Sequence, residues 1–270
     1  MACSRRSGLT ASREPSPSMQ LAELNWRQVA DLSKDIPFVV PVAAVEQHGH
    51  HLPVYTDSFL LGEIVRRVEL ALGDRLVVAP LQWLGNSDHH LDFPGTLSAA
   101  PRTYLDLLGG LIENALLHGF RRIVFLNGHG GNDVPGRQAI FEARQRHRGR
   151  ADLLLLFATY WNLAEWDEGE AVRFRQSQMG HACEWETSMI LRLNPKLVGP
   201  IEGLETVESR GAFEPASRAW ITKDITRWGH IGEPSAATAE KGEILFRTFA
   251  AGAVRLLERV VAWDGRSWKG

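Results

Sequence analysis

Residues 37–53 read Pro-Phe-Val-Val-Pro-Val-Ala-Ala-Val-Glu-Gln-His-Gly-His-His-Leu-Pro, an apolar run that ends in a polar, histidine-rich turn. The run from Phe38 to Val45 predicts a buried strand because it is short, apolar and free of charge. Glu46 and His48 follow two residues apart, so their side chains point the same way if the strand continues. Carboxylate oxygens and imidazole nitrogens are ligands for divalent metals. The stretch therefore predicts a metal site at the carboxyl end of a strand, with a histidine-rich surface loop as the alternative.

Asp57 adds a second carboxylate to this group. The turn through Gly49 and Pro53 can bring it back over Glu46 and His48. Asp57 also stands near the start of an expected helix, where a carboxylate interacts favourably with the helix dipole. It is therefore either a metal ligand or an N-terminal helix carboxylate.

Apolar runs alternate with amphipathic segments along most of the chain. We expect strands over 38–45, 75–80, 123–126 and 153–158. We expect helices over 21–32, 57–72, 103–118, 134–147, 180–193 and 236–263. Alternating helices and buried strands favour an α/β fold with a mostly parallel sheet covered on both faces.

Ligands of such sheets bind outside the carboxyl ends of the strands. Glu46 and His48 follow one predicted strand, and His129, in Asn-Gly-His-Gly-Gly-Asn, follows another. The turn-rich loop 85–96 follows a third and is of the kind that holds ligands. Residues 127–132 make a weak phosphate loop, because they lack a lysine and the full glycine spacing. The segments thus converge on one candidate site.

Two carboxylates lie on the helix expected over 180–193. On a helical wheel Glu186 shares an arc with apolar residues, so its charge needs a cation or a hydrogen-bond partner. Glu184 points to another side, where it could stay solvated, and stands three residues after His181. Those two could form a proton-transfer pair, while a loop or capping role is the alternative for His181. We interpret Cys183 as a small buried apolar residue rather than a nucleophile.

Composition narrows the class of protein. The 270 residues are 44% hydrophobic with a net charge of -2. This charge does not indicate the basic surface that nucleic-acid binding requires. Two cysteines cannot form a disulfide framework, and no apolar stretch is long enough to span a membrane. We expect a cytoplasmic protein with a disordered tail over 1–19 and a single domain over 20–270. The polar segment 159–179, which carries Trp161 and Trp166, reads as a loop or short helices over the site, or as a surface excursion.

Four motifs together resemble the creatininase (creatinine amidohydrolase) family. They are Glu46-Gln47-His48-Gly49 with Pro53 and Asp57, Phe93-Pro94-Gly95-Thr96, Asn127-Gly128-His129-Gly130-Gly131-Asn132, and Gly180-His181-Ala182 with Glu186-Thr187-Ser188. The resemblance implies a three-layer α/β/α fold, two divalent metal ions such as Zn, Mn or Fe, a small-molecule amide substrate, and a homo-oligomer, often a hexamer. It also implies ligand roles: Glu46 and His129 for one ion, His48 for the other and Asp57 for both, with His181 as the proton-transferring histidine.

The chain departs from creatininase itself at two positions. Gly131 stands where creatininase has a glutamate ligand, and Ser177 stands where it has a substrate-contacting tryptophan. Family members with that glycine act on other amides; they include a formamide deformylase and a peptidase that trims a redox-cofactor precursor. We therefore expect a substrate other than creatinine. Glu186 is the expected replacement ligand, with Glu184 in reserve.

These patterns predict a metal-dependent amidohydrolase that cleaves a non-peptide or small cyclic amide C–N bond with a metal-activated water. His181 or Glu184 would pass a proton to the leaving nitrogen. The deformylase or precursor-peptidase activity is the alternative within the family. A non-catalytic metal-binding relative would lack a ligand or proton donor, and a nucleotide-binding protein would need a phosphate loop.

Overall fold

The computed structural model describes residues 19–208, 213 and 215–266. Its strands are β1 (Met19–Gln20), β2 (Phe38–Val42), β3 (Val77–Val78), β4 (Arg122–Asn127) and β5 (Leu154–Thr159). Its α-helices are α1 (Trp26–Asp31), α2 (Thr56–Leu72), α3 (Pro101–Leu117), α4 (Asp133–Arg146), α5 (Glu168–Ala171), α6 (Glu184–Leu193) and α7 (Ala239–Ala262). The strands pair in the order β1-β3-β2-β4-β5, and every pairing is parallel.

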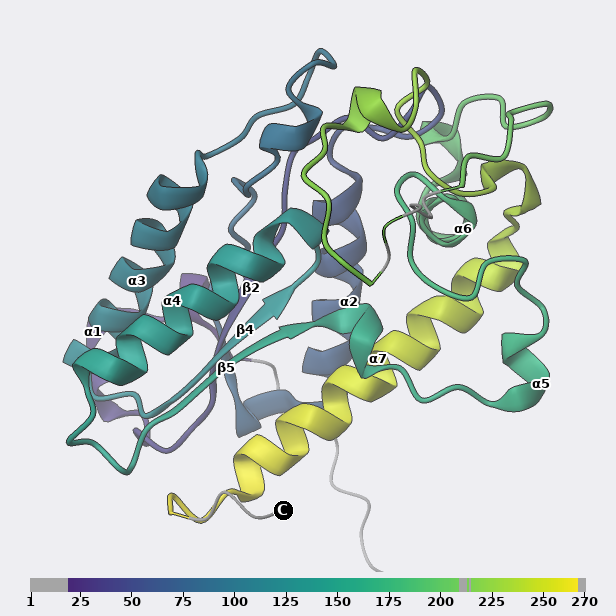
Figure 1. Cartoon of the computed structure of the whole chain (residues 1–270). Helices are drawn as coiled ribbons and strands as arrows, with labels where there is room; N and C mark the ends of the chain where they lie inside the picture. The colour runs from purple at the N-terminus through teal and green to yellow at the C-terminus, as the bar shows by residue number, and fades with distance from the viewer. Residues whose placement is uncertain (1–18, 209–212, 214, 267–270) are drawn as a thin grey trace, which may run out of the picture.

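Helices cover both faces of the sheet (Figure 1). Alternate strand residues point to opposite faces, so neighbouring residues of one strand enter different cores. Val39 packs in the core formed with α2, α6 and α7, whereas Val40 packs in the core formed with α3 and α4. This arrangement is the three-layer α/β/α fold that the sequence predicts.

The chain reverses its direction across the sheet between β2 and β4. These strands are neighbours, with Phe38 opposite Ile123 and Val42 opposite Asn127. The helix that follows β2 packs on one face and the helix that follows β4 packs on the other. A reversal of this kind opens a crevice at the carboxyl ends of the two strands, where ligands bind in open α/β sheets.

Several strand and helix boundaries in the structure differ from those predicted from the sequence. The β2 ladder ends at Val42, because from Ala43 onward the backbone bonds to other segments: the Ala43 N–H donates to the Gln82 carbonyl at 2.9 Å. Beyond the ladder, Val45 pairs with Leu97 in an isolated antiparallel bridge. The helix expected over 180–193 begins only at Glu184. The disordered tail predicted over 1–19 lies outside the described residues except for Met19, which pairs in β1.

Among the described residues, no helix combines the length and the apolar character that a membrane crossing requires.

Candidate metal centre

The turn after β2 brings Glu46, His48 and Asp57 together. The Glu46 N–H donates to the Val54 carbonyl at 2.9 Å, which folds residues 46–54 into a closed turn. That turn delivers Asp57 to the first turn of α2, where it faces back toward His48. His48 Nε2 lies 3.2 Å from Asp57 Oδ1. All three side chains are at least 97% buried, so their charges need partners within the protein.

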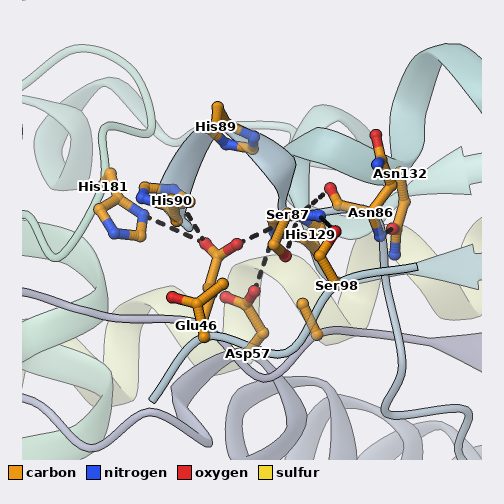
Figure 2. A network of polar contacts seen from close by, with 12 residues as sticks. Glu46, Asp57, Asn86, Ser87, His89, His90, Ser98, His129, Asn132 and His181 are labelled. Atoms are coloured by element: carbon orange, nitrogen blue, oxygen red, sulfur yellow. Dashed lines mark hydrogen bonds and ion pairs between the residues drawn. The ribbon is translucent and has the colours of Figure 1, made fainter. Parts of the chain in front are cut away.

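His129 joins this group from the carboxyl end of β4. Its Nδ1 lies 3.0 Å from Asp57 Oδ2, and its Nε2 lies 3.3 Å from Glu46 Oε2 (Figure 2). Asn127 Oδ1 accepts the His129 backbone N–H at 3.1 Å, which fixes the backbone, and the ring Nε2 lies 3.0 Å from the Asn86 carbonyl oxygen. The predicted convergence of β2 and β4 on one site is thus present in the structure.

Glu186 reaches the same site from the first turn of α6. Its Oε1 lies 3.8 Å from His48 Nε2, and the residue is 5% exposed. The ligand atoms of His48, Asp57 and Glu186 all lie within 4.8 Å of one another, as do those of Glu46, Asp57 and His129. Asp57 is common to both groups, as expected for a carboxylate shared by two ions.

The charges of the cluster depend on one another. Burial raises the pKa of Glu46 to about 7. Burial would also raise the pKa of Asp57, but His48 and His129 outweigh it and hold that pKa well below the usual range. For His129 burial lowers the pKa, yet Glu46 and Asp57 reverse the shift and raise it to about 9. In the absence of a cation, protons on imidazoles therefore balance the buried carboxylates.

Several candidate metal-ligand atoms in the cluster lack a well-formed hydrogen bond to any described residue. They are Glu46 Oε2, His48 Nε2, Asp57 Oδ2 and Glu186 Oε2. A buried polar atom without a partner costs free energy, and four in one cluster are more than a packed core tolerates. Oxygen and imidazole donors in this arrangement fit divalent ions such as Zn and Mn.

The structure leaves no room for a side chain at position 131. A Cβ on Gly131 would lie 2.1 Å from the Asn86 carbonyl oxygen and 2.5 Å from His129 Nε2. A glutamate there would have to displace the loop after β3 and the imidazole of a candidate ligand. The carboxylate that completes the second group comes instead from Glu186, on a different element.

Glu184 lies outside the cluster, and its burial corrects the expectation that it stays solvated. It is fully buried rather than solvated. Its Oε2 accepts the backbone N–H groups of Arg175 and Gln176, each at 2.9 Å, and its Oε1 pairs with Lys241 Nζ. No hydrogen bond or ion pair joins it to His181 in the described chain. Its contacts indicate that Glu184 positions the segment before His181.

His181 stands at the edge of the cluster. Its Nδ1 lies 3.4 Å from Glu46 Oε1, and its Nε2 is 2.7 Å from the Gln47 carbonyl oxygen. A carbonyl only accepts, so Nε2 carries the proton and the lone pair on Nδ1 faces Glu46. Burial lowers the pKa of His181 well below the usual value, which keeps the imidazole neutral.

The next residue, Ala182, has φ of 47°, a left-handed conformation that non-glycine residues seldom adopt outside constrained sites.

His90 is a site residue that the sequence did not single out. It belongs to the 3-10 turn Asp88–His90, in the loop that was expected to hold ligands. Its Nε2 lies 3.4 Å from Glu46 Oε1, and its ring stacks on that of His181 with centroids 4.2 Å apart. The Gln47 side-chain nitrogen lies 2.8 Å from His90 Nδ1 and 3.0 Å from His181 Nε2. Gln47 thus contacts both imidazoles beside Glu46: its side-chain amide can donate to His90 Nδ1, and its backbone carbonyl accepts the His181 Nε2 proton.

A cavity of about 780 Å³ opens over the cluster. Its wall includes Glu46, Asp57, Glu186 and His181, together with Trp161 from the segment after β5. The prediction that segment 159–179 lies over the site therefore holds for Trp161. Trp166 packs instead against Trp185, with ring centroids 5.4 Å apart, as the surface-excursion alternative expected.

The family model described as creatinine amidohydrolase matches residues 22–257. The chain belongs to the creatininase family. It is 31% identical over 235 residues to the mycofactocin precursor peptide peptidase of Mycolicibacterium smegmatis, with 85% of this chain and 86% of that protein covered. It is 30% identical over 255 residues to the creatinine amidohydrolase of Pseudomonas putida, with 88% and 95% covered. Like these relatives, this creatininase-family chain is a hydrolase.

The fold of the creatininase family is confirmed by solved structures. A crystal structure of creatinine amidohydrolase matches with a TM-score of 0.76 and 27% identity, covering 90% of this chain and 98% of that one. Similar structures include a Zn-Zn type of a creatininase variant and a manganese creatininase. The creatininase resemblance drawn from the motifs is therefore confirmed.

Proposed function

We propose that this creatininase-family hydrolase is a metal-dependent amidohydrolase that cleaves an amide C–N bond of a small molecule. The observation that carries the proposal is the shared position of Asp57 between two groups of buried ligand atoms, several of which lack a well-formed hydrogen bond to any described residue. Glu46, Asp57 and His129 would hold one divalent ion, and His48, Asp57 and Glu186 would hold the second. Such ions, when bound, polarise a carbonyl oxygen and lower the pKa of water.

The protein's own groups supply the proton steps. His181 is neutral, carries its proton on Nε2 and presents the lone pair of Nδ1 toward Glu46. That nitrogen can take a proton from the attacking water and return it to the leaving amine, without which an amide nitrogen leaves poorly. The Gln47 backbone carbonyl keeps the ring in this orientation, and the 780 Å³ cavity gives the substrate access.

Two observations favour a substrate other than creatinine. The cavity is much larger than a small cyclic amide needs, since pockets of about 300–1,000 Å³ hold drug-sized ligands. Gly131 also changes the source of one ligand carboxylate. The relative from M. smegmatis is a precursor-peptide peptidase, so hydrolysis of a peptide or formamide is the second candidate function.

The buried free thiol of Cys183 suits a reducing cytoplasm, and a homo-oligomer remains our expectation from the family resemblance.

The deciding experiment combines metal content with turnover. Protein loaded with Zn or Mn is assayed on cyclic amides, formamides and short peptides for release of amine or carboxylate. We expect hydrolysis that a chelator removes and that Glu186→Gln greatly reduces together with one ion. Glu258→Gln, an exposed substitution of the same kind on α7, should retain both ions and full rate. A Glu186→Gln variant with full metal content and full rate would refute the ligand assignment.

A further inference from the structure

The segment 218–222 is fixed beside the candidate metal centre although it is distant in sequence. Thr222 is fully buried, and its Oγ1 donates to the His89 carbonyl at 2.8 Å. The same oxygen lies 2.8 Å from His90 Nδ1. The Trp220 ring meets the His89 ring edge to face, with centroids 5.1 Å apart. These contacts attach the segment to the loop that carries His89 and His90.

This attachment places Arg218 at the mouth of the cavity. Arg218 lines the cavity and is also exposed, so it lies where the cavity opens to solvent. It is the one arginine or lysine among the described lining residues. No carboxylate in the described ranges lies within ion-pair distance of its guanidinium, whereas most arginines of α2 and α4 have such a partner. A guanidinium at the mouth with no carboxylate partner among the described residues can bind a negative group of a ligand.

The cavity wall also carries apolar and aromatic side chains. Trp161, Trp220 and Val134 contribute to it, and Val134 is 78% exposed. Deeper in the cavity stand three carboxylates, which two divalent ions would more than neutralise. The loaded site would therefore not repel an anion, and Arg218 would attract one.

We propose that the substrate is an amide that carries a carboxylate, which Arg218 binds at the mouth, next to an apolar or aromatic portion that packs on Trp220 and Trp161. This inference rests on the proposed amidohydrolase function, because it assumes that the amide reaches the metal centre. It assigns Arg218 to substrate selection and leaves the bond-breaking chemistry to the centre itself.

Matched ligands test the proposal on the metal-loaded protein. N-Acetyl-L-phenylalanine and N-acetylphenethylamine share an amide and a phenyl ring and differ by the carboxylate. Binding is measured by calorimetry and by quenching of tryptophan fluorescence, and hydrolysis of both is followed in parallel. For wild type against Arg218→Gln we expect the anionic ligand to lose about fivefold in affinity, and the neutral ligand to lose nothing. Arg218→Lys should restore part of the difference, and added salt should weaken only the anionic ligand.

Arg148→Gln is the control, because Arg148 is exposed in the turn that follows α4 and the substitution changes net charge equally. Equal affinity of wild type and Arg218→Gln for N-acetyl-L-phenylalanine would overturn the inference, and so would an equal loss for the neutral ligand. Failure of N-acetyl-L-phenylalanine to bind the wild-type protein would overturn it as well. Arg218-dependent binding without hydrolysis of any amide would keep the anion site and count against the amidohydrolase function. Hydrolysis at the same rate in wild type and Arg218→Gln would support the amidohydrolase function and count against the anion site.

Discussion

The substitution Lys241→Met isolates the role of Glu184. Glu184 is fully buried, and its Oε1 has Lys241 Nζ as its partner, while Oε2 accepts two backbone N–H groups. Removing the ammonium leaves a buried carboxylate with one oxygen unpaired. The geometry therefore predicts a loss of stability and no direct effect on the chemical step.

The size of the loss follows from the surroundings of the pair. Removing one partner of a buried ion pair costs about 3–5 kcal/mol. Two backbone donors remain on Glu184, and the Lys241 side chain is 16% exposed, so the lower part of that range applies. With about 3–4 kcal/mol lost, and roughly 2–4 °C of melting temperature per kcal/mol for a domain of this size, Tm should fall by roughly 6–16 °C.

Thermal unfolding at fixed protein and metal concentration measures this fall. The double variant Glu184→Gln/Lys241→Met removes both charges and should recover most of the stability. Arg75→Met breaks an exposed pair with Glu258 and should change the free energy of unfolding by less than about 1 kcal/mol. If Lys241→Met left Tm unchanged while Glu184→Gln abolished turnover in folded protein, Glu184 would return to the list of catalytic residues.

Three further predictions concern the candidate metal centre. Asp57→Asn should lose both ions in elemental analysis, because both donor groups share that carboxylate, and full occupancy would end the bridging assignment. His181→Ala should keep its metal but lose about 10²- to 10⁴-fold in kcat, the usual worth of a proton-transfer group; metal depletion would make it a ligand instead. Metal affinity should rise with pH up to about 9, because below that pH the ion must displace the proton that Glu46 and Asp57 hold on His129. A flat titration of affinity between pH 6 and 9 would contradict this.

Much of the fold is encoded locally, which is why the sequence predicts it. The apolar run after Pro37 can only be a buried strand, and the three- and four-residue spacing of Leu60, Leu61, Ile64 and Val68 fixes the buried face of α2. Parallel strands bring their carboxyl ends to one edge, so Glu46 and His129 could be placed together without coordinates.

What the sequence could not supply depends on contacts between distant segments. Glu184 and Lys241 are 57 residues apart, and no local pattern reveals that the lysine neutralises the glutamate. His90 belongs to a loop already suspected of holding a ligand, yet its approach to Glu46 depends on Gln47 and on Thr222, 132 residues away. The doublet His89-His90 beside a turn was the available signal, and it did not show which imidazole faces the cluster.

Gly131 constrains how this protein can change over evolution or in the laboratory. Because the Asn86 carbonyl oxygen occupies the space that a side chain at 131 would need, a single Gly131→Glu replacement cannot simply add a ligand. The backbone after β3 and the carboxylate on α6 would have to change in concert with it. A change that moved the candidate ligand carboxylate from Glu186 to position 131 would therefore require several coordinated substitutions. Intermediates that carry only one of them would have a distorted centre.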